Sequence, residues 1–438
     1  MKRVNCCVEL LEERRMLAGN VTAEVVGGVL TINGDSKGNG VILDSITRRT
    51  GPFRLSGDAT TTINGQNAPV DLAGVSDVKI NLGAGKNSLE VHGIRLPGKL
   101  VIDTGRGGDL VEVQTVQVQG AITVRSGGGN DVVEVGAISG ADKKIVTGDG
   151  DDIVLFNGGR NRRLLVNTGS GDDLVFNDGD HRHPVQIDDG PGRDRIGSQR
   201  IDKEYNFGRL PRNARGWQGG FADYFQGRER DQQLKWEYRN NDHPSAGEVN
   251  HRPSLYIQGV NNTDDLFMFF TKTLGAADGI KPNTSYLIGY GINFSSNSPS
   301  NCAGIGGAPG ESVFLKAGAS SIQPRVSPDE EGIQRLNIGH GQQGRSGKAV
   351  SVVGNIANGQ DCPANPTFVR MLRKDIHPTL VTTGADAKLH LIVGTESGFE
   401  GMTRLYYHGI TVTLIKFEEV ETRAEGPVGA VDRAHGQL

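Results

Sequence analysis

Aspartate side chains recur at a regular spacing through the first half of the chain, where together they could hold a metal ion. One acid stands at the same offset within each of five glycine-rich turns, and an asparagine takes that place in the turn before them. Calcium takes roughly six to eight oxygen ligands, many of them carboxylates. Stacked turns could therefore bind calcium through carboxylate and backbone oxygens. The residues of this column are Asn87, Asp109, Asp131, Asp152, Asp173 and Asp194.

A second interpretation of the column needs no metal. Asp and Asn side chains cap tight turns by hydrogen bonding to nearby backbone groups. We expect the column to be exposed, with neighbouring carboxylates about 4.8 Å apart and repelling by roughly 1 kcal/mol per pair in water. Solvent tolerates that repulsion. Calcium binding and turn capping both stay open at this point.

A second set of acids lies in glycine-rich or aromatic segments of the other half of the chain. Paired carboxylates about 5–10 Å apart could hydrolyse glycosides. These acids are far apart in sequence, however, and nothing in their spacing brings them together, so the alternative is that they make turns and loop hydrogen bonds. They are Asp223, Asp264, Asp265, Glu311, Glu396 and Glu400.

Aromatic residues of the same half are candidates for carbohydrate binding. Flat amphipathic rings stack on sugar rings, and nearby polar side chains bond the hydroxyls. Residues 25–200 contain no Trp and no Tyr. The alternative is that the rings belong to the core, where aromatic residues contribute the largest burial energy. The carbohydrate-binding candidates are Trp217, Tyr224, Trp236, Tyr256 and Tyr406.

Several other classes of function lack their motifs. The glycine-rich segment 304–312 has no Lys-Ser/Thr pair and no βαβ setting, which excludes a P-loop. No Gly-x-Ser-x-Gly elbow is present, so a serine hydrolase is not indicated. A net charge of −4 gives no case for a nucleic-acid partner, and no apolar stretch reaches the ~18 residues that span a bilayer.

The glycine-rich turns themselves repeat at spacings of 22, 22, 21, 21 and 21 residues. A fixed period of this size is typical of repeats that bury their apolar faces against one another. Alternating β-branched residues flank each turn and predict strands. We therefore expect residues 25–200 to form a right-handed parallel β-helix of 21–22-residue coils. The first glycines should lie in one column: Gly83, Gly105, Gly127, Gly148, Gly169 and Gly190.

Beyond the last repeat the pattern changes. Eight β-rich runs joined by long polar loops predict an antiparallel β-sandwich, most simply a jelly roll, over residues 217–418. A charged stretch, 201–216, is expected to be a linker. We expect residues 1–24 to form a leader or sorting segment and 419–438 a disordered tail. The predicted fold class is thus all-β.

Two cysteines, Cys302 and Cys362, lie beyond the leader. Two cysteines with no third cysteine nearby, in a domain that we expect to be exported, predict one disulfide bond. In the chain-entropy model, closing a loop of about 60 residues would add roughly 4 kcal/mol of stability. No spacing of Cys and His indicates a zinc site.

The turn sequence resembles the calcium-binding repeats-in-toxin nonapeptide, Gly-Gly-x-Gly-x-Asp followed by an apolar residue. Residues 147–153 match it best. The resemblance implies calcium binding but covers only the turn. That family places two motifs on each coil, whereas this chain has one in every 21 or 22 residues.

Residues 11–19 resemble the Leu-Glu-Pro-Arg…Leu-Leu motif near the start of many planctomycete surface proteins, which implies export to the cell envelope. An ordinary amphipathic helix turn is the alternative. The residues that match this N-terminal motif are Leu11, Glu12, Arg14 and Leu17, whereas Glu13 and Met16 replace the family's Pro and Leu.

Residues 217–418 resemble an uncharacterised bacterial secreted domain, through segments 216–224, 264–269, 304–313 and 394–401.

We therefore expect an extracellular or cell-envelope protein without enzymatic activity. A β-solenoid spacer would carry a jelly-roll domain that binds a polysaccharide or another cell-surface component. Two alternatives stay open, a polysaccharide lyase or glycosidase on the β-helix and a purely structural surface-layer component. An enzyme on the β-helix needs clustered Asp, Lys and Arg on one face. The arginines are scattered instead, at Arg106, Arg125, Arg160, Arg162 and Arg163.

Overall fold

The computed structural model describes residues 19–417 except for eight short segments, which are 48–50, 59–60, 140–141, 158–162, 179–184, 241–252, 263–264 and 363–364. The described residues form two compact units, which meet in sequence between Gly197 and Ser198. Both units consist of strands and loops, with a single short 3₁₀ helix among the described residues, η1 (Ala276–Asp278). The predicted all-β class is confirmed.

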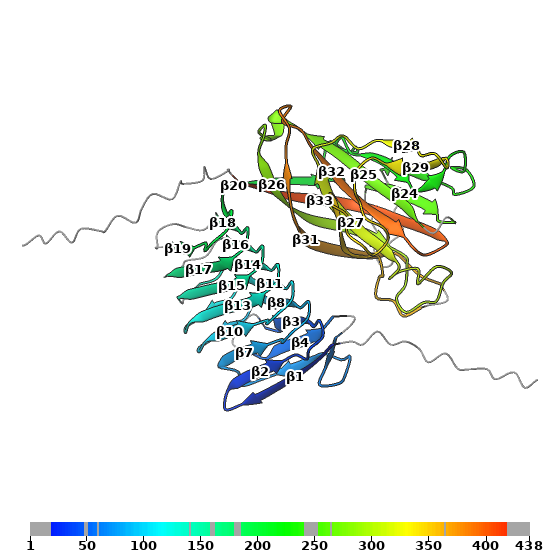
Figure 1. The fold of residues 1–438 in the computed structure, drawn as a ribbon. Helices are drawn as coiled ribbons and strands as arrows, with labels where there is room; N and C mark the ends of the chain where they lie inside the picture. Colours follow the sequence, from blue (N-terminus) through cyan, green and yellow to red (C-terminus); the bar gives the residue numbers. More distant parts are fainter. Residues whose placement is uncertain are drawn as a thin grey trace, which may run out of the picture. The chain divides into compact units, whose positions relative to one another are not determined.

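The first unit is a solenoid whose strands stack into long, mainly parallel sheets (Figure 1). A small third sheet joins β9 (Arg95–Leu96) to β12 (Gln117–Val118). The first long sheet runs in the order β19 (Val185–Asp188), β17 (Leu164–Ser170), β15 (Lys143–Asp149), β13 (Ile122–Gly128), β10 (Leu100–Asp103), β7 (Asp77–Asn81), β2 (Val29–Asn33), β1 (Gly19–Val26) and β5 (Thr61–Ile63). The second contains β18 (Leu174–Asp178), β16 (Ile153–Asn157), β14 (Val132–Gly136), β11 (Leu110–Gln114), β8 (Ser88–His92), β3 (Gly40–Ser45), β4 (Phe53–Gly57) and β6 (Val70–Leu72).

The solenoid starts earlier than the sequence predicts. β1 begins at Gly19 and pairs antiparallel with β2, so residues 19–24 belong to the fold and not to a leader. β4 likewise pairs antiparallel with β3 and β6. Terminal repeats of a solenoid are atypical because they must cover an otherwise open end of the core. These antiparallel strands serve as that cover. Residues 1–18 lie outside the described part of the chain.

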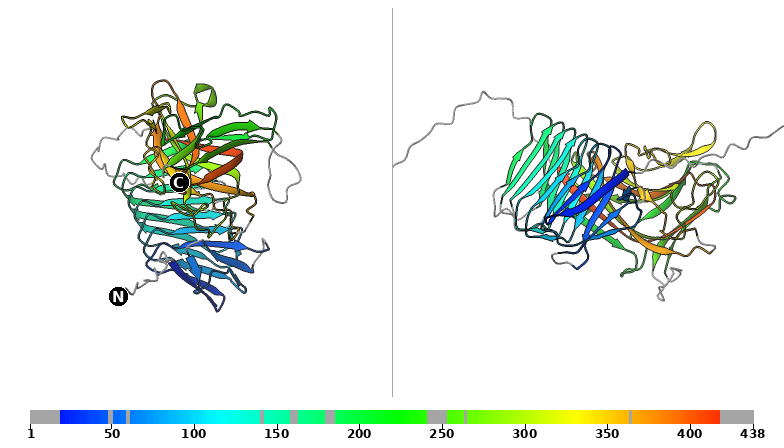
Figure 2. Two further views of the ribbon diagram at one scale, coloured as in Figure 1. Left: turned by 90° about the vertical axis from the view of Figure 1, so that its right-hand side faces the viewer. Right: turned by 90° about the horizontal axis from the view of Figure 1, so that it is seen from below.

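Successive coils stack in register, and Figure 2 shows the strands running side by side. Ile102 lies opposite Val124, which lies opposite Ile145 and then Val166. Buried side chains alternate with half-buried ones along strands such as β10, whereas consecutive residues of β16 and β18 are buried. The interior columns make one continuous apolar core.

The six turn glycines stack in one column, as the sequence predicts. Gly127, Gly148 and Gly169 are register partners on neighbouring coils. Gly148 has a φ of +104°, and a Cβ built there would lie 1.7 Å from the carbonyl oxygen of Gly127. The backbones of neighbouring turns therefore approach too closely for any side chain, and the period of glycines in the sequence follows from this contact.

The second unit is an antiparallel β-sandwich with an extensive apolar core. A smaller sheet joins β22 (Tyr224–Phe225), β29 (Ile333–Leu336) and β28 (Val326–Pro328). One main sheet runs in the order β21 (Gln218–Ala222), β25 (Leu266–Leu274), β32 (Leu389–Ser397), β27 (Val313–Ser320) and β30 (Val350–Asn355). The other contains β23 (Lys235–Arg239), β24 (Ser254–Val260), β33 (Met402–Phe417), β26 (Ser285–Ser296) and β31 (Val369–Thr382).

The predicted linker is partly a strand. β20 (Arg195–Asn206) extends through the boundary between the units, so residues 201–206 are extended and hydrogen bonded. Its charged residues are accommodated on the surface, where Arg200 Nε lies 3.0 Å from Asp202 Oδ2 and Thr413 Oγ1 donates to Asp202 Oδ1 at 2.7 Å. The charge run therefore marks an exposed strand face. The predicted tail, 419–438, lies outside the described residues.

Candidate functional site

An open groove of about 640 Å³ lies on the second unit. Its walls come from the end of β20, the loop that follows, the start of β21 and the middle of β23. Aromatic and polar side chains share the lining, a mixture that is typical of sites for polar small molecules and sugars. The lining includes Glu204, Tyr205, Asn213, Arg215, Trp217, Gln218 and Trp236.

Three groove residues carry buried donor atoms that lack a hydrogen-bond partner among the described residues. They are the Tyr205 hydroxyl, the Arg215 Nε and the Trp217 indole nitrogen. Tyr205 is 8% exposed and Trp217 is 1% exposed. Leaving a buried polar group unsatisfied costs about 1–3 kcal/mol. These three donor atoms are enclosed beneath the groove, so the contacts open to a ligand come from the half-buried Trp236 and from the exposed side chains of Glu204, Asn213 and Gln218.

Arg215 is held in place by its surroundings. Its Nη2 donates to the carbonyl oxygens of Arg209 at 2.7 Å and Leu210 at 3.0 Å, and Lys272 Nζ donates to the Arg215 carbonyl at 2.8 Å. Its φ of +49° lies in the left-handed region, which a side-chain-bearing residue adopts at some cost.

The five predicted carbohydrate-binding aromatics do not share one surface. Trp217, Tyr256 and Tyr406 are buried, at 1%, 3% and 4% exposure, so the structure corrects the expectation that their faces are free to stack on sugars. Burying these large rings in the sandwich stabilises the folded state more than leaving them exposed would. Tyr256 and Tyr406 instead pack on each other, with ring centroids 4.8 Å apart.

Trp236 and Tyr224 are half-buried. The Trp236 indole lies directly over Gly219, where a Cβ would come within 2.3 Å of Trp236 Cγ, and it meets the ring of Phe270 edge-on at 6.1 Å. The missing side chain of Gly219 thus makes room for the indole. Of the five candidates, the groove brings together Trp217 and Trp236, whereas Tyr224 lies on β22.

Three of the scattered acids, Asp223, Asp265 and Glu396, do converge in the interior of the second unit. His340 lies between Asp223 and Glu396, with its Nε2 3.2 Å from Asp223 Oδ2 and its Nδ1 3.4 Å from Glu396 Oε2. Lys316 Nζ forms an ion pair with Glu396 and donates to the His340 carbonyl at 2.8 Å. Arg335 Nη1 donates to Asp223 Oδ1 at 2.8 Å. Sequence reasoning missed the basic partners because no local motif marks them.

The cluster is electrostatically compensated. Burial alone would lower the pKa of His340, but hydrogen bonds and charges from Asp223 and Glu396 raise that pKa to about 9. Burial would raise the pKa of Glu396, yet the hydrogen bonds and charges of His340, Asp265 and Lys316 hold it below the usual value. Burial, followed by the hydrogen bond and charge of Glu396, raises the pKa of Asp265 to about 8.

This cluster is arranged for stability more than for glycoside hydrolysis. Asp265 is hydrogen bonded to Glu396, which leaves no gap of about 5–10 Å for a sugar and a water molecule between them. Lys316 and Glu396 are each 0% exposed. Of the other acids, Glu311 accepts a hydrogen bond from Asn301 N at 2.9 Å, and Glu400 is exposed. Asp264 lies outside the described residues.

The cysteines form the predicted disulfide. Cys302 and Cys362 are bonded, with Cα atoms 5.1 Å apart. The bond joins two loops of the second unit that are separated by 60 residues in sequence. An isolated bridge between Ser300 and Asp361 lies beside it. The disulfide therefore fixes the loop that also contains Glu311's partner, Asn301.

The aspartate column of the solenoid is buried, which corrects the expectation of an exposed column. Asp109, Asp131, Asp152 and Asp173 are between 0% and 2% exposed. Each Oδ1 accepts a hydrogen bond from the backbone N–H of the equivalent residue on the preceding coil, at 2.8 Å for each of these four. Asp194 continues the ladder at 2.9 Å but is half-buried. The column links coils to one another as well as closing turns.

The second oxygen of each buried aspartate has no hydrogen-bond partner among the described residues. Asn87, at the same place one coil earlier, uses its side-chain nitrogen to donate to the carbonyls of Gly85 and Thr104 at 2.9 Å each. A protonated carboxyl could donate in the same way. Burial accordingly raises the pKa of Asp131 to about 6 and that of Asp152 to about 7. Calcium binding by the column stays a prediction.

The sequence matches no protein-family model and no curated protein. Solved structures with some likeness include a mannan-recognising carbohydrate-binding module, at 12% identity over 49% of this chain and 98% of that one, with a TM-score of 0.24. Tailspike protein 4 of bacteriophage CBA120 is 10% identical over 80% of this chain and 54% of its own, with a TM-score of 0.22. The K1 adhesin domain of Lys-gingipain from Porphyromonas gingivalis W83 is 12% identical over 50% of this chain and 99% of its own, with a TM-score of 0.20. Likeness at this level carries no argument about function.

Proposed function

We propose that the second unit binds a polysaccharide in the groove beside Trp236, and that the solenoid serves as a rigid spacer. The observation that carries the proposal is an open groove in which the half-buried Trp236 indole lies with the exposed polar side chains of Glu204, Asn213 and Gln218. Sugar hydroxyls and ring oxygens are acceptors, and a sugar ring stacks on an indole face. The groove offers both kinds of contact.

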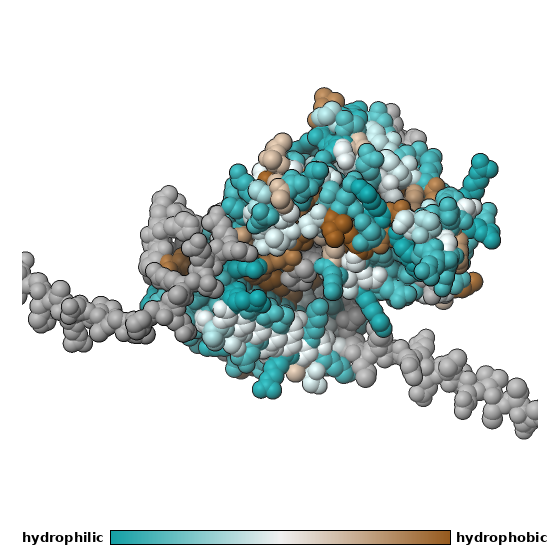
Figure 3. Space-filling model, turned by 45° about the horizontal axis from the view of Figure 1, so that its top comes forward, coloured by the Kyte–Doolittle hydropathy of each residue, from teal (hydrophilic) through white to brown (hydrophobic). Residues whose placement is uncertain are grey.

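The nature of the surface supports a polar ligand. On the face of the molecule drawn in Figure 3, hydrophilic residues predominate and apolar residues form small groups. Large apolar patches mark stable protein–protein interfaces. Among the described residues no helix is long and apolar enough to cross a bilayer. Export to the cell envelope is part of the same proposal and rests on the sequence motif at 11–19.

Glycan-array screening of the full chain, followed by calorimetry with the best glycan, tests the proposal. We expect Trp236→Ala to weaken binding by about two- to tenfold, because stacking on an aromatic ring contributes roughly 0.5–1.5 kcal/mol. Gln218→Ala, at an exposed groove position, should also weaken binding without disturbing the core. Tyr224→Ala, another half-buried aromatic outside the groove, is the matched control.

Two results would refute the proposed site. One is the absence of binding to any glycan by a folded protein. The other is binding that survives both Trp236→Ala and Gln218→Ala but is lost on Tyr224→Ala. Circular dichroism of each variant shows whether the sandwich is still folded.

A further inference from the structure

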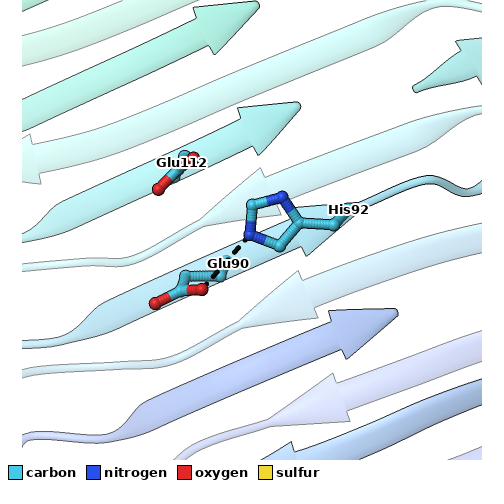
Figure 4. A group of neighbouring side chains, drawn as sticks. All are labelled: Glu90, His92 and Glu112. Carbon is cyan, nitrogen blue, oxygen red and sulfur yellow. Dashed lines mark hydrogen bonds and ion pairs between the residues drawn. The ribbon is translucent and has the colours of Figure 1, made fainter. Parts of the chain in front are cut away.

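The outer face of the solenoid carries a group of potential metal ligands that the predicted calcium column does not include. Glu90 and His92 lie two residues apart on β8 and so face the same side of the sheet. Glu112 lies on β11, directly opposite Glu90 in the register of neighbouring coils. Figure 4 shows the three side chains gathered on that face. All three are half-buried.

Their atoms are close enough to share one ion. His92 Nε2 lies 3.2 Å from Glu90 Oε2, and one ligand atom from each of the three residues lies within 4.8 Å of the others. Zinc binds imidazole nitrogen and carboxylate oxygen at about 2.0–2.2 Å, so ligand atoms around it stand roughly 3–3.6 Å apart. A change of the Glu112 side-chain torsion angles brings its carboxylate into that range, while the sheet keeps its strand in register with β8.

The charge pattern of this face favours a cation. Glu134 lies opposite Glu112 on the next coil, and Asp44 lies opposite His92 on the preceding one. Like charges directly opposite each other on neighbouring strands destabilise a sheet. Gln114 Nε2 donates to Glu134 Oε1 at 2.9 Å and so relieves part of this repulsion at one end. Between Glu90 and Glu112 the imidazole is the group positioned to bridge the two carboxylates.

We propose that Glu90, His92 and Glu112 bind a divalent transition-metal ion of the zinc type. One imidazole and two carboxylates supply three ligands, and water completes the coordination shell. The nitrogen ligand distinguishes this site from a calcium site, because calcium prefers oxygen ligands throughout. The ion would fasten two adjacent coils of the solenoid at one point on its outer face.

Calorimetric titration of the metal-stripped full chain with ZnCl₂ tests the proposal. We expect one zinc ion per chain with a rise in the melting temperature of the solenoid. His92→Gln and Glu112→Gln should each weaken zinc binding by roughly tenfold or more, since each removes a direct ligand. Cobalt substitution should give visible absorption bands that His92→Gln abolishes.

Glu134→Gln is the matched control, because it removes the same formal charge from the same face without removing a ligand. It should change zinc affinity by about twofold or less, as expected for a screened surface charge. An absence of zinc binding at millimolar concentration would overturn the proposal. Equal weakening by Glu134→Gln and Glu112→Gln, with no effect of His92→Gln, would also overturn it and indicate diffuse electrostatic attraction.

Discussion

Lys316 and Glu396 are both fully buried, and each is the principal counter-charge of the other inside the second unit. Removing one partner of a buried ion pair costs about 3–5 kcal/mol, because the remaining charge is left uncompensated. We therefore expect Lys316→Met to lower the free energy of unfolding by about that amount. Urea denaturation followed by tryptophan fluorescence measures it, since Trp217 and Trp236 both lie in this unit.

Lys388→Met is the control for this prediction. Lys388 pairs with Asp386 at 3.8 Å, and its side chain is 54% exposed. Exposed pairs contribute about 0–1 kcal/mol. Equal destabilisation by the two variants would show that the interior cluster is not a stabilising network.

The same cluster predicts how the stability of the second unit depends on pH. The folded-state pKa of His340, about 9, lies above its value in the unfolded chain, so its contribution is complete below about pH 6.5 and is lost as pH rises through 9. The raised pKa of Asp265, about 8, acts in the same direction between about pH 4 and 8. Unfolding free energy should fall from pH 6 to pH 10, and His340→Gln should reduce the slope above pH 7. A wild-type stability that rises over this range would contradict the prediction.

At the level of the coil, the buried aspartate ladder makes the solenoid sensitive to pH. The pKa of Asp152 is raised to about 7 in the fold, so the native state holds a proton that the unfolded chain releases near pH 4. Stability associated with this group is therefore present below about pH 4 and is lost as pH rises through 7. We expect Asp152→Asn to stabilise the solenoid by roughly 1–3 kcal/mol at pH 8 and to have little effect near pH 4.

Asn87 shows that an amide fits this position in the ladder. Asp151→Asn is the control, since it removes the same formal charge from an exposed neighbour. Differential scanning calorimetry at the two pH values measures both variants. A loss of stability in Asp152→Asn at pH 8 would mean that the carboxylate is needed as an anion. Repeating the calorimetry with millimolar calcium then tests the prediction that the aspartate column binds calcium.

The glycine column gives a second prediction at this scale. Gly148→Ala places a Cβ 1.7 Å from a backbone oxygen at a φ of +104°, whereas Gly74→Ala, at a φ of +71°, places one in open space. The unfavourable φ costs about 1–2 kcal/mol in both. Only Gly148→Ala must also separate two coils, so we expect it to destabilise the solenoid by about 4 kcal/mol or more. Similar losses in the two variants, by hydrogen exchange or calorimetry, would refute the close-contact explanation.

At the level of the whole molecule, the two units should respond separately to reduction. The disulfide between Cys302 and Cys362 encloses a long loop of the second unit, and such a bond contributes roughly 4 kcal/mol in the chain-entropy model. We expect a reductant, or a Cys302→Ser and Cys362→Ser double variant, to lower the melting temperature of the second unit. The transition of the solenoid should be unchanged in the same calorimetric scan. A shift of both transitions by the same amount would contradict independent stability of the units.

The sequence by itself determined the solenoid, the all-β class and the disulfide. Each coil contacts the next at a constant offset of 21 or 22 residues, so the close contact at Gly148 leaves a period that is visible along the chain. Cys302 and Cys362 are the only cysteines after Cys7, which left one possible pairing between them. The proximity of Glu90 and Glu112 could also have been predicted from the sequence, because the two residues are one solenoid period apart.

Only the tertiary structure decided which side chains face inward and which acids meet. The aspartates were predicted to be exposed because a turn residue normally faces solvent, but the tight turn directs them into the core, where each binds the coil before it. Asp223, Lys316, His340 and Glu396 lie on separate strands and loops, and the pairing of those strands brings them together. Such contacts depend on the order of strands in a sheet, which local sequence does not encode, since any strand of suitable pattern could occupy the neighbouring place.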